Sequence, residues 1–224
     1  MDMLSWQAIR DAQLDDWRKL AEGLHARFLI GSFADGARFV GAVGEACAAG
    51  GHAPEVRLGN GFADVRLLSD DAVEPGTDEG YPSVTQRDVD LARRISSIAQ
   101  SLGLSADPSA VAQVELGLDT ADLAAVGPFW AAVLTGDAGA YDRIDVCDPT
   151  GRVMNLWFQR TDAHETPRQR FHLDLWLPPE VVPARIEAAL AAGGSVVADD
   201  EAPSFTVLAD PEGNKVCLCT YLDR

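Results

Sequence analysis

A nine-residue motif occurs twice in the second half of this 224-residue chain, and it constrains the fold more than any other feature. The segment 148–156 (DPTGRVMNL) returns at 210–218 (DPEGNKVCL). In both copies a proline presets φ, a glycine suits a turn, and an alternating strand pattern follows. A strand pattern and then a helix pattern precede each copy, at 114–118 and 121–134 and again at 171–177 and 179–192. The repeat therefore predicts two βαβββ modules, at residues 113–160 and 171–222.

Alternation along these strands sorts their side chains onto two faces. One face is apolar, and we expect all of it to pack against the helices. Its members are Val114, Leu116, Leu118, Met154, Leu156, Phe158, Leu173, Leu175, Leu177, Val216 and Leu218. Polar groups and two tryptophans share the other face, which predicts a cup for a small molecule or, alternatively, a surface that docks against the first half. The candidate binding residues of this cup are Glu115, Asn155, Trp157, His172, Asp174 and Trp176.

Paired βαβββ modules of this kind resemble the vicinal oxygen chelate superfamily, which includes glyoxalase-like and bleomycin-resistance-like domains. In metal-using members the resemblance implies ligands on the first and last strand of each module, which are here Glu115, Asn155, His172 and Cys217. A carboxylate, an imidazole and a thiolate suit zinc, but an amide is a poor fourth ligand. We therefore expect no divalent metal; if one is bound, its predicted ligands are Glu115, His172 and Cys217.

The stretch from residue 50 to 95 organises the first half of the chain. His52 and Ala53 precede Pro54, whose ring ends a helical pattern, and an alternating strand pattern follows over 64–67. Thr85 and Asp88 have the spacing of a capping box, and apolar residues then recur at helical spacing. A short first helix, two strands and a long second helix are predicted before residue 50, and two strands and a last helix after it. The predicted order is therefore αββαββα, with an antiparallel sheet and helices on one face.

This stretch resembles the pterin-4a-carbinolamine dehydratase family (4a-hydroxytetrahydrobiopterin dehydratase), in which a His-His-Pro motif follows a helix and a Thr-His precedes the last helix. His52 and Pro54 match the first histidine and the proline, and Thr85 to Asp88 matches the start of the last helix. Three positions depart from the pattern: Ala53 replaces the second histidine, Asp70 the third, and Ala48 an acidic residue. The resemblance covers about the first 105 residues.

The predicted domains are 1–104 and 113–224, joined by a linker over 105–112. The fold class is therefore α+β, with the αββαββα unit followed by the paired βαβββ modules. The acidic segment 69–83 is expected to be a lid or a disordered loop.

Composition limits the partners. The formal net charge of −17 excludes nucleic-acid binding through a basic surface. Four cysteines without regular spacing are typical of a reduced, cytoplasmic protein. No run of about 18 apolar residues occurs, so we expect no membrane span. The dehydratase resemblance implies assembly with copies of the same chain, as a homodimer or a higher homo-oligomer.

Dehydration of a 4a-hydroxytetrahydropterin requires a proton for the departing hydroxyl and a base for the ring-nitrogen proton. An imidazole exchanges protons near neutral pH and suits both roles. The predicted catalytic residue is His52, assisted by Asp70 or Glu55, with Pro54 and Asp88 at the substrate; Asp88 is alternatively only a helix cap. We expect pterin as the substrate and no required cofactor. Two alternatives stay open: the second domain's cup is the working site, or the protein binds ligands without catalysis.

Overall fold

The computed structural model divides the 224 residues into two compact units. It describes residues 1–21, 23–48, 51–77, 80–135, 137–142, 144–146, 148, 150–151, 154–163, 171–191, 194–209 and 215–223. The first unit comprises Met1–Ala112 with two short later segments, and the second comprises Gln113–Leu177 with Val182–Cys219. In the part of the chain that the structure describes, no helix has the length and apolar character needed to cross a bilayer.

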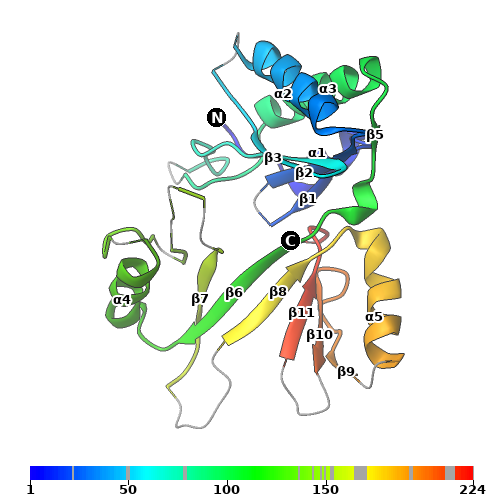
Figure 1. Cartoon of the computed structure of the whole chain (residues 1–224). Helices are drawn as coiled ribbons and strands as arrows, with labels where there is room; N and C mark the ends of the chain where they lie inside the picture. The colour runs from blue at the N-terminus through cyan, green and yellow to red at the C-terminus, as the bar shows by residue number, and fades with distance from the viewer. Residues whose placement is uncertain are drawn as a thin grey trace. The chain divides into compact units, whose positions relative to one another are not determined.

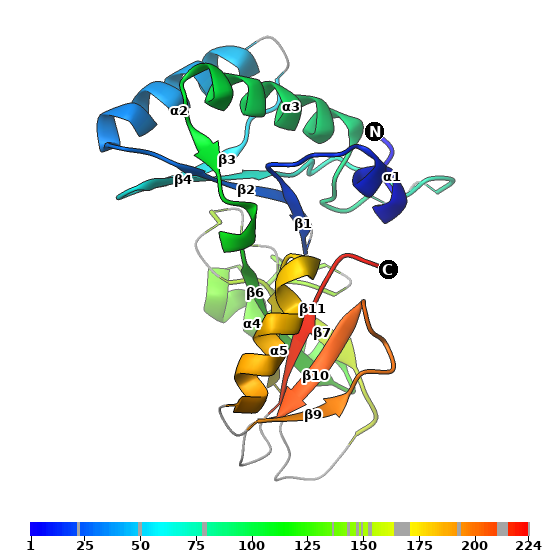
Figure 2. The ribbon, with the colours of Figure 1, turned by 90° about the vertical axis from the view of Figure 1, so that its right-hand side faces the viewer.

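The first unit is an antiparallel sheet covered by helices. Its elements are α1 (Trp6–Asp11), β1 (Arg18–Leu20), β2 (Gly23–Leu29), α2 (Phe33–Cys47), β3 (Glu55–Gly59), β4 (Phe62–Leu67), α3 (Gln86–Ser101), β5 (Ser105–Ala106) and the 3-10 helix η1 (Pro108–Ala110). The strands are ordered β1-β2-β4-β3, and β5 pairs with β2. Helices α2 and α3 lie side by side over the sheet (Figures 1 and 2). The predicted αββαββα order is confirmed.

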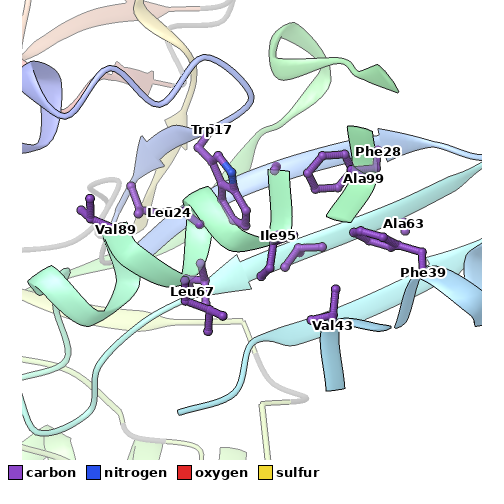
Figure 3. Close-up of a cluster of buried hydrophobic side chains, with 14 of the residues drawn as sticks. Trp17, Leu24, Phe28, Phe39, Val43, Ala63, Leu67, Val89, Ile95 and Ala99 are labelled. Atoms are coloured by element: carbon purple, nitrogen blue, oxygen red, sulfur yellow. The ribbon is translucent and has the colours of Figure 1, made fainter. Parts of the chain in front are cut away.

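The core of this unit lies between the sheet and the two long helices (Figure 3). Phe28 of β2 packs against Phe39 of α2, with ring centroids 5.1 Å apart, and meets Trp17 edge-on at 6.2 Å. The indole nitrogen of Trp17 donates to Ser96 Oγ at 3.0 Å, which satisfies its polar atom at the core's edge. Ile95 supplies the apolar face of α3 and is fully buried.

Part of the predicted linker belongs to the first sheet. Strand β1 covers only the start of one edge of β2, where Arg18 faces His25. Further along β2, Phe28 and Leu29 pair with Ala106 and Ser105. The short β1 leaves backbone groups of β2 for another strand to satisfy, and β5 takes that place. The segment 105–112, predicted as the linker between the domains, thus contains the short strand β5 and the 3-10 helix η1.

The second unit contains the paired modules as one mixed sheet. Its elements are β6 (Gln113–Thr120), α4 (Leu123–Thr135), β7 (Leu156–Arg160), β8 (Phe171–Trp176), α5 (Val182–Ala191), β9 (Ser195–Ala198), β10 (Phe205–Ala209) and β11 (Lys215–Cys219). The 3-10 helix η2 (Pro179–Val181), which precedes α5 in the chain, belongs to the first unit. The strand order is β7-β6-β8-β11-β10-β9. The second module shows the full βαβββ order, whereas the described residues of the first add only isolated bridges between α4 and β7.

Two separate apolar clusters form on the helix-covered side of this sheet. One joins α4 to Leu118, Leu156 and Phe158, and the other joins α5 to Leu177, Leu208 and Leu218 (Figure 1). The expectation that the whole apolar face packs against helices is wrong at three positions, because α4 and α5 cover different strands. The exposed members are Val114, Met154 and Leu173.

Candidate functional sites

His52 lies between α2 and β3 and pairs with a buried carboxylate. Its Nε2 is 2.7 Å from Asp88 Oδ1, although the two residues are 36 positions apart in sequence. The His52 side chain is 13% exposed and that of Asp88 is fully buried. Gly51 precedes the histidine with φ of 63°, a left-handed conformation that glycine adopts without steric cost. The backbone turn thus directs the imidazole back towards the start of α3.

Asp88 belongs to the capping box of α3 and to a polar network at the same time. Its Oδ2 accepts from the Thr85 backbone N–H at 2.7 Å, from Thr85 Oγ1 at 3.0 Å and from Ser69 Oγ at 2.7 Å. The predicted capping box is confirmed. Because both oxygens act as acceptors, the His52 ring donates through Nε2 and its Nδ1 remains for a ligand. Sequence reasoning missed Ser69, since nothing local indicates its bond to Asp88.

Two hollows meet at His52. A polar hollow of about 390 Å³ is lined by Gly51, His52, Ala53, Leu68, Asp70, Asp71 and Arg87. An apolar hollow of about 410 Å³ is lined by Val40, Val43, Gly44, Cys47, Ala48, Gly51, His52, Ala53, Pro54 and Val56. The imidazole therefore separates a polar surface from an apolar one, an arrangement suited to a ring that has one polar edge.

The polar hollow places the predicted Asp70 beside two charged groups, Asp71 and Arg87, that the sequence did not single out. Arg87 pairs with Asp71, and its guanidinium lowers the pKa of that carboxyl. Asp70 is exposed beside them. The base of the acidic loop is closed by a bridge between Ser69 and Ser83, which holds these acids near His52.

Glu55, the other candidate carboxylate, lies elsewhere. It stands on β3, is exposed, and accepts from Arg66 Nη1 at 3.2 Å. It lines neither hollow, whereas Pro54 lines the apolar one.

In the second unit, the predicted cup residues share one face of the sheet around His172. The His172 ring lies over Gly117, where an added Cβ would stand 2.4 Å from its Cε1. Trp157 meets the ring edge-on, with centroids 5.2 Å apart. Asp119, two residues beyond Gly117 on β6, faces the Nδ1 of the ring at 3.8 Å. Strand alternation could have placed Asp119 on this face.

Glu115 is buried and held by other members of the cup. Its Oε1 accepts from Asn155 Nδ2 at 3.0 Å and its Oε2 from Trp176 Nε1 at 2.6 Å. The same Asn155 amide also reaches Asp145 at 3.2 Å. This carboxylate therefore fixes the position of two neighbouring side chains.

A different set of side chains has the spacing of metal ligands. One donor atom from each of His172, Asp174 and Cys217 lies within 4.8 Å of the other two. The internal repeat explains why Asp174 belongs to this set. Leu116 pairs with Leu156, and Leu175 with Leu218, so that Asp174 rather than His172 is the repeat counterpart of Glu115. The two acids also face each other across β6 and β8.

Comparisons with known proteins agree with this division of the chain. Residues 3–98 match the family profile described as pterin 4 alpha carbinolamine dehydratase, and residues 115–219 match that of a glyoxalase-like domain. Both resemblances seen in the sequence are confirmed. The first half of the chain is therefore similar to pterin-4a-carbinolamine dehydratases, and the second half is similar to glyoxalase-like domains.

Individual relatives are more distant. No curated protein matches the chain at a significant level. A crystal structure described as a transcriptional coactivator/pterin dehydratase from Brucella Melitensis is 22% identical, with a TM-score of 0.37. The similarity covers 44% of this chain and 99% of that chain.

Proposed function

We propose that the first domain dehydrates a 4a-hydroxytetrahydropterin, with His52 as the proton-transferring residue and Asp88 as its positioning partner. The observation that carries the proposal is the 2.7 Å contact between the two side chains at the edge of the polar hollow. The match to the dehydratase family supports the reaction class, a hydro-lyase.

The reaction removes water across the C4a–N5 bond of the pterin. The C4a–O bond breaks, the electron pair of the N5–H bond forms the C4a=N5 double bond, and the hydroxyl leaves as water after gaining a proton. One proton leaves N5 and one reaches the oxygen, so the number of protons on the protein is the same before and after the reaction. His52 Nδ1 is suited to this exchange because Asp88 holds Nε2.

Asp70 is the second group proposed for the reaction. Asp70 and His52 both line the polar hollow, so a ligand bound in the hollow can contact both side chains. An ionised carboxylate is a hydrogen-bond acceptor only, so Asp70 is suited to receive the N5 proton or to bind a donor of the pterin ring. Ala53 contributes no titratable group, so His52 alone delivers the proton to the departing hydroxyl, from the imidazolium that forms when Nδ1 takes up a proton.

A dehydration assay on freshly generated carbinolamine tests this assignment. We expect the catalysed dehydration rate, after subtraction of the rate in buffer, to fall by about 100-fold or more in His52→Gln. The amide of this variant can still donate to Asp88. The matched control is Asp90→Asn, which alters an exposed carboxylate on α3, two residues from Asp88. Unchanged turnover in His52→Gln, or a wild-type rate equal to that of buffer, would overturn the proposal.

The alternative working site is the cup of the glyoxalase-like domain. It is favoured by Glu115 and Asp174, two buried carboxylates that face each other on strands β6 and β8. This proposal predicts a small molecule that co-purifies with the wild-type protein and is lost in Trp157→Ala. Mass spectrometry of the denatured, filtered protein detects it independently of any pterin assay.

We also propose that the protein is cytoplasmic and that it assembles with copies of itself. Oligomeric relatives of the dehydratase family support this assembly. Light scattering on the full-length protein tests it, and a mass equal to one chain over a broad concentration range would contradict it.

A further inference from the structure

We propose that His172, Asp174 and Cys217 bind a zinc ion on the cup face of the second domain. The proposal does not depend on pterin dehydration by the first domain. It also differs from the arrangement that the family resemblance implies, which takes one ligand from each of four strands. Here two ligands stand on β8, two residues apart, and one stands on the neighbouring β11.

The distance between His172 and Asp174 fits two ligands of one ion. His172 Nε2 lies 3.5 Å from Asp174 Oδ1, which is long for a charge-assisted hydrogen bond. A tetrahedral zinc ion with nitrogen at about 2.0–2.1 Å and oxygen at about 2.0–2.2 Å separates these atoms by roughly 3.4 Å. Cys217 lies directly beside Asp174 in the parallel ladder, and all three donor atoms fall within 4.8 Å.

The imidazole is oriented from its other nitrogen, as is usual for a metal-bound histidine. Nδ1 of His172 faces Asp119 Oδ1 at 3.8 Å, while Nε2 faces Asp174. The Asp119 carboxylate on this side of the ring favours an orientation in which Nε2 faces Asp174. Gly117 leaves room for the ring, because a Cβ there would occupy the same space.

A buried indole nitrogen points to a further group at this place. Trp157 packs edge-on against His172, and its Nε1 is fully buried without a hydrogen-bond partner among the residues that the structure describes. A buried donor of this kind is normally satisfied. A water or ligand oxygen bound to the ion would supply the acceptor, which suits an open fourth position on zinc.

Donor chemistry selects zinc over harder cations. A thiolate, an imidazole and a carboxylate form a mixed set that zinc accepts, whereas magnesium and calcium require oxygen ligands. Binding replaces the thiol proton of Cys217, which passes to solvent, so affinity rises with pH. Glu115 is not part of the donor cluster, and its oxygens instead accept from Asn155 and Trp176.

Metal titration of the full-length protein tests the site without any activity assay. After treatment with a chelator, the protein is titrated with Zn²⁺ and Co²⁺, and the retained metal is measured by elemental analysis. We expect one Zn²⁺ per chain and a thiolate-to-cobalt charge-transfer band with Co²⁺. Absence of stoichiometric binding, or an ion bound without this band, would overturn the proposal.

Variants identify the ligands. Cys217→Ser should abolish the charge-transfer band, and Asp174→Asn should weaken Zn²⁺ binding strongly. Asp119→Asn should keep the band but lower the affinity by about 10–100-fold. Cys47→Ser, which changes a half-buried thiol of the first domain, is the matched control.

Glu115→Gln separates this ligand set from the one that the resemblance implies. We expect it to retain the ion. Equal loss of Zn²⁺ in Glu115→Gln and Asp174→Asn, or a band that persists in Cys217→Ser, would refute the assignment. Circular dichroism of each variant shows whether the fold is intact.

Discussion

His52 and His172 are both flanked by carboxylates, yet the two environments favour different chemistry. In the first domain one carboxylate oxygen lies 2.7 Å from Nε2 and belongs to a buried network. In the second, carboxylates face both ring nitrogens, at 3.8 and 3.5 Å. A short contact to one nitrogen fixes the tautomer and leaves the other nitrogen for proton transfer. Longer contacts at both nitrogens fit a ring that is oriented on one side and binds a cation on the other.

The prediction with the largest expected effect asks whether the single imidazole of the first site limits its dehydration rate. Ala53→His places a second ring where both hollows meet, and we expect dehydration to accelerate by about 100-fold. Ala48→His is the control, because Ala48 lines only the apolar hollow. Equal rates for the two variants would show that a second imidazole does not assist from position 53.

A second prediction concerns how much the Asp88 carboxylate contributes to the stability of the first domain. Asp88→Ala removes the acceptor of four hydrogen bonds. It leaves the buried Thr85 backbone N–H without its acceptor, and the Ser69 and Thr85 hydroxyls with only each other as partners. We expect the free energy of unfolding of the first domain to fall by about 2–4 kcal/mol. Urea unfolding followed by circular dichroism, with hydrogen exchange of α3, measures the loss. Asp90→Ala, at an exposed position, should change the free energy of unfolding far less. Equal losses in the two variants would show that Asp88 does not stabilise the domain more than a surface carboxylate does.

A third prediction concerns the room around His172. Gly117→Ala should push the ring aside and lower Zn²⁺ affinity by about tenfold. Gly44→Ala is the control, since its Cβ meets open space on α2, and it should stabilise the first domain by about 0.5–1 kcal/mol. Calorimetric titration with Zn²⁺ distinguishes the two. Unchanged affinity in Gly117→Ala would mean that the ring does not bind the ion from this position.

The smallest expected effect distinguishes the thiols of the two sites. Burial raises the pKa of the Cys47 thiol, so below that pKa less of it is thiolate than in a free cysteine. Iodoacetamide at pH 8 should therefore modify Cys47 a few-fold more slowly than free cysteine, and Zn²⁺ should not alter that rate. Zn²⁺ should protect Cys217 instead. Peptide mass spectrometry measures modification at each cysteine separately. If Zn²⁺ protected Cys47 and not Cys217, the assignment of the ion to the second domain would be wrong.

Local patterns predicted most of the architecture. Capping of α3 by Asp88 depends on neighbours three residues apart, and the βαβββ order depends on a motif that occurs twice. The apolar periodicity of α2 and α3 likewise follows from the sequence, because a helix repeats its own geometry without reference to the rest of the chain. The place of β5 did not follow, since it depends on how far β1 covers β2.

The sequence by itself determined that each half resembles a known family, that a histidine precedes a helix-ending proline, and which residues share the cup face. Only the tertiary structure decided what surrounds each histidine. Asp88 reaches His52 across 36 positions, and strand register makes Asp174 rather than His172 the repeat partner of Glu115. Periodicity specifies which way a side chain points, but the side chain that it meets depends on register and on turns between distant segments.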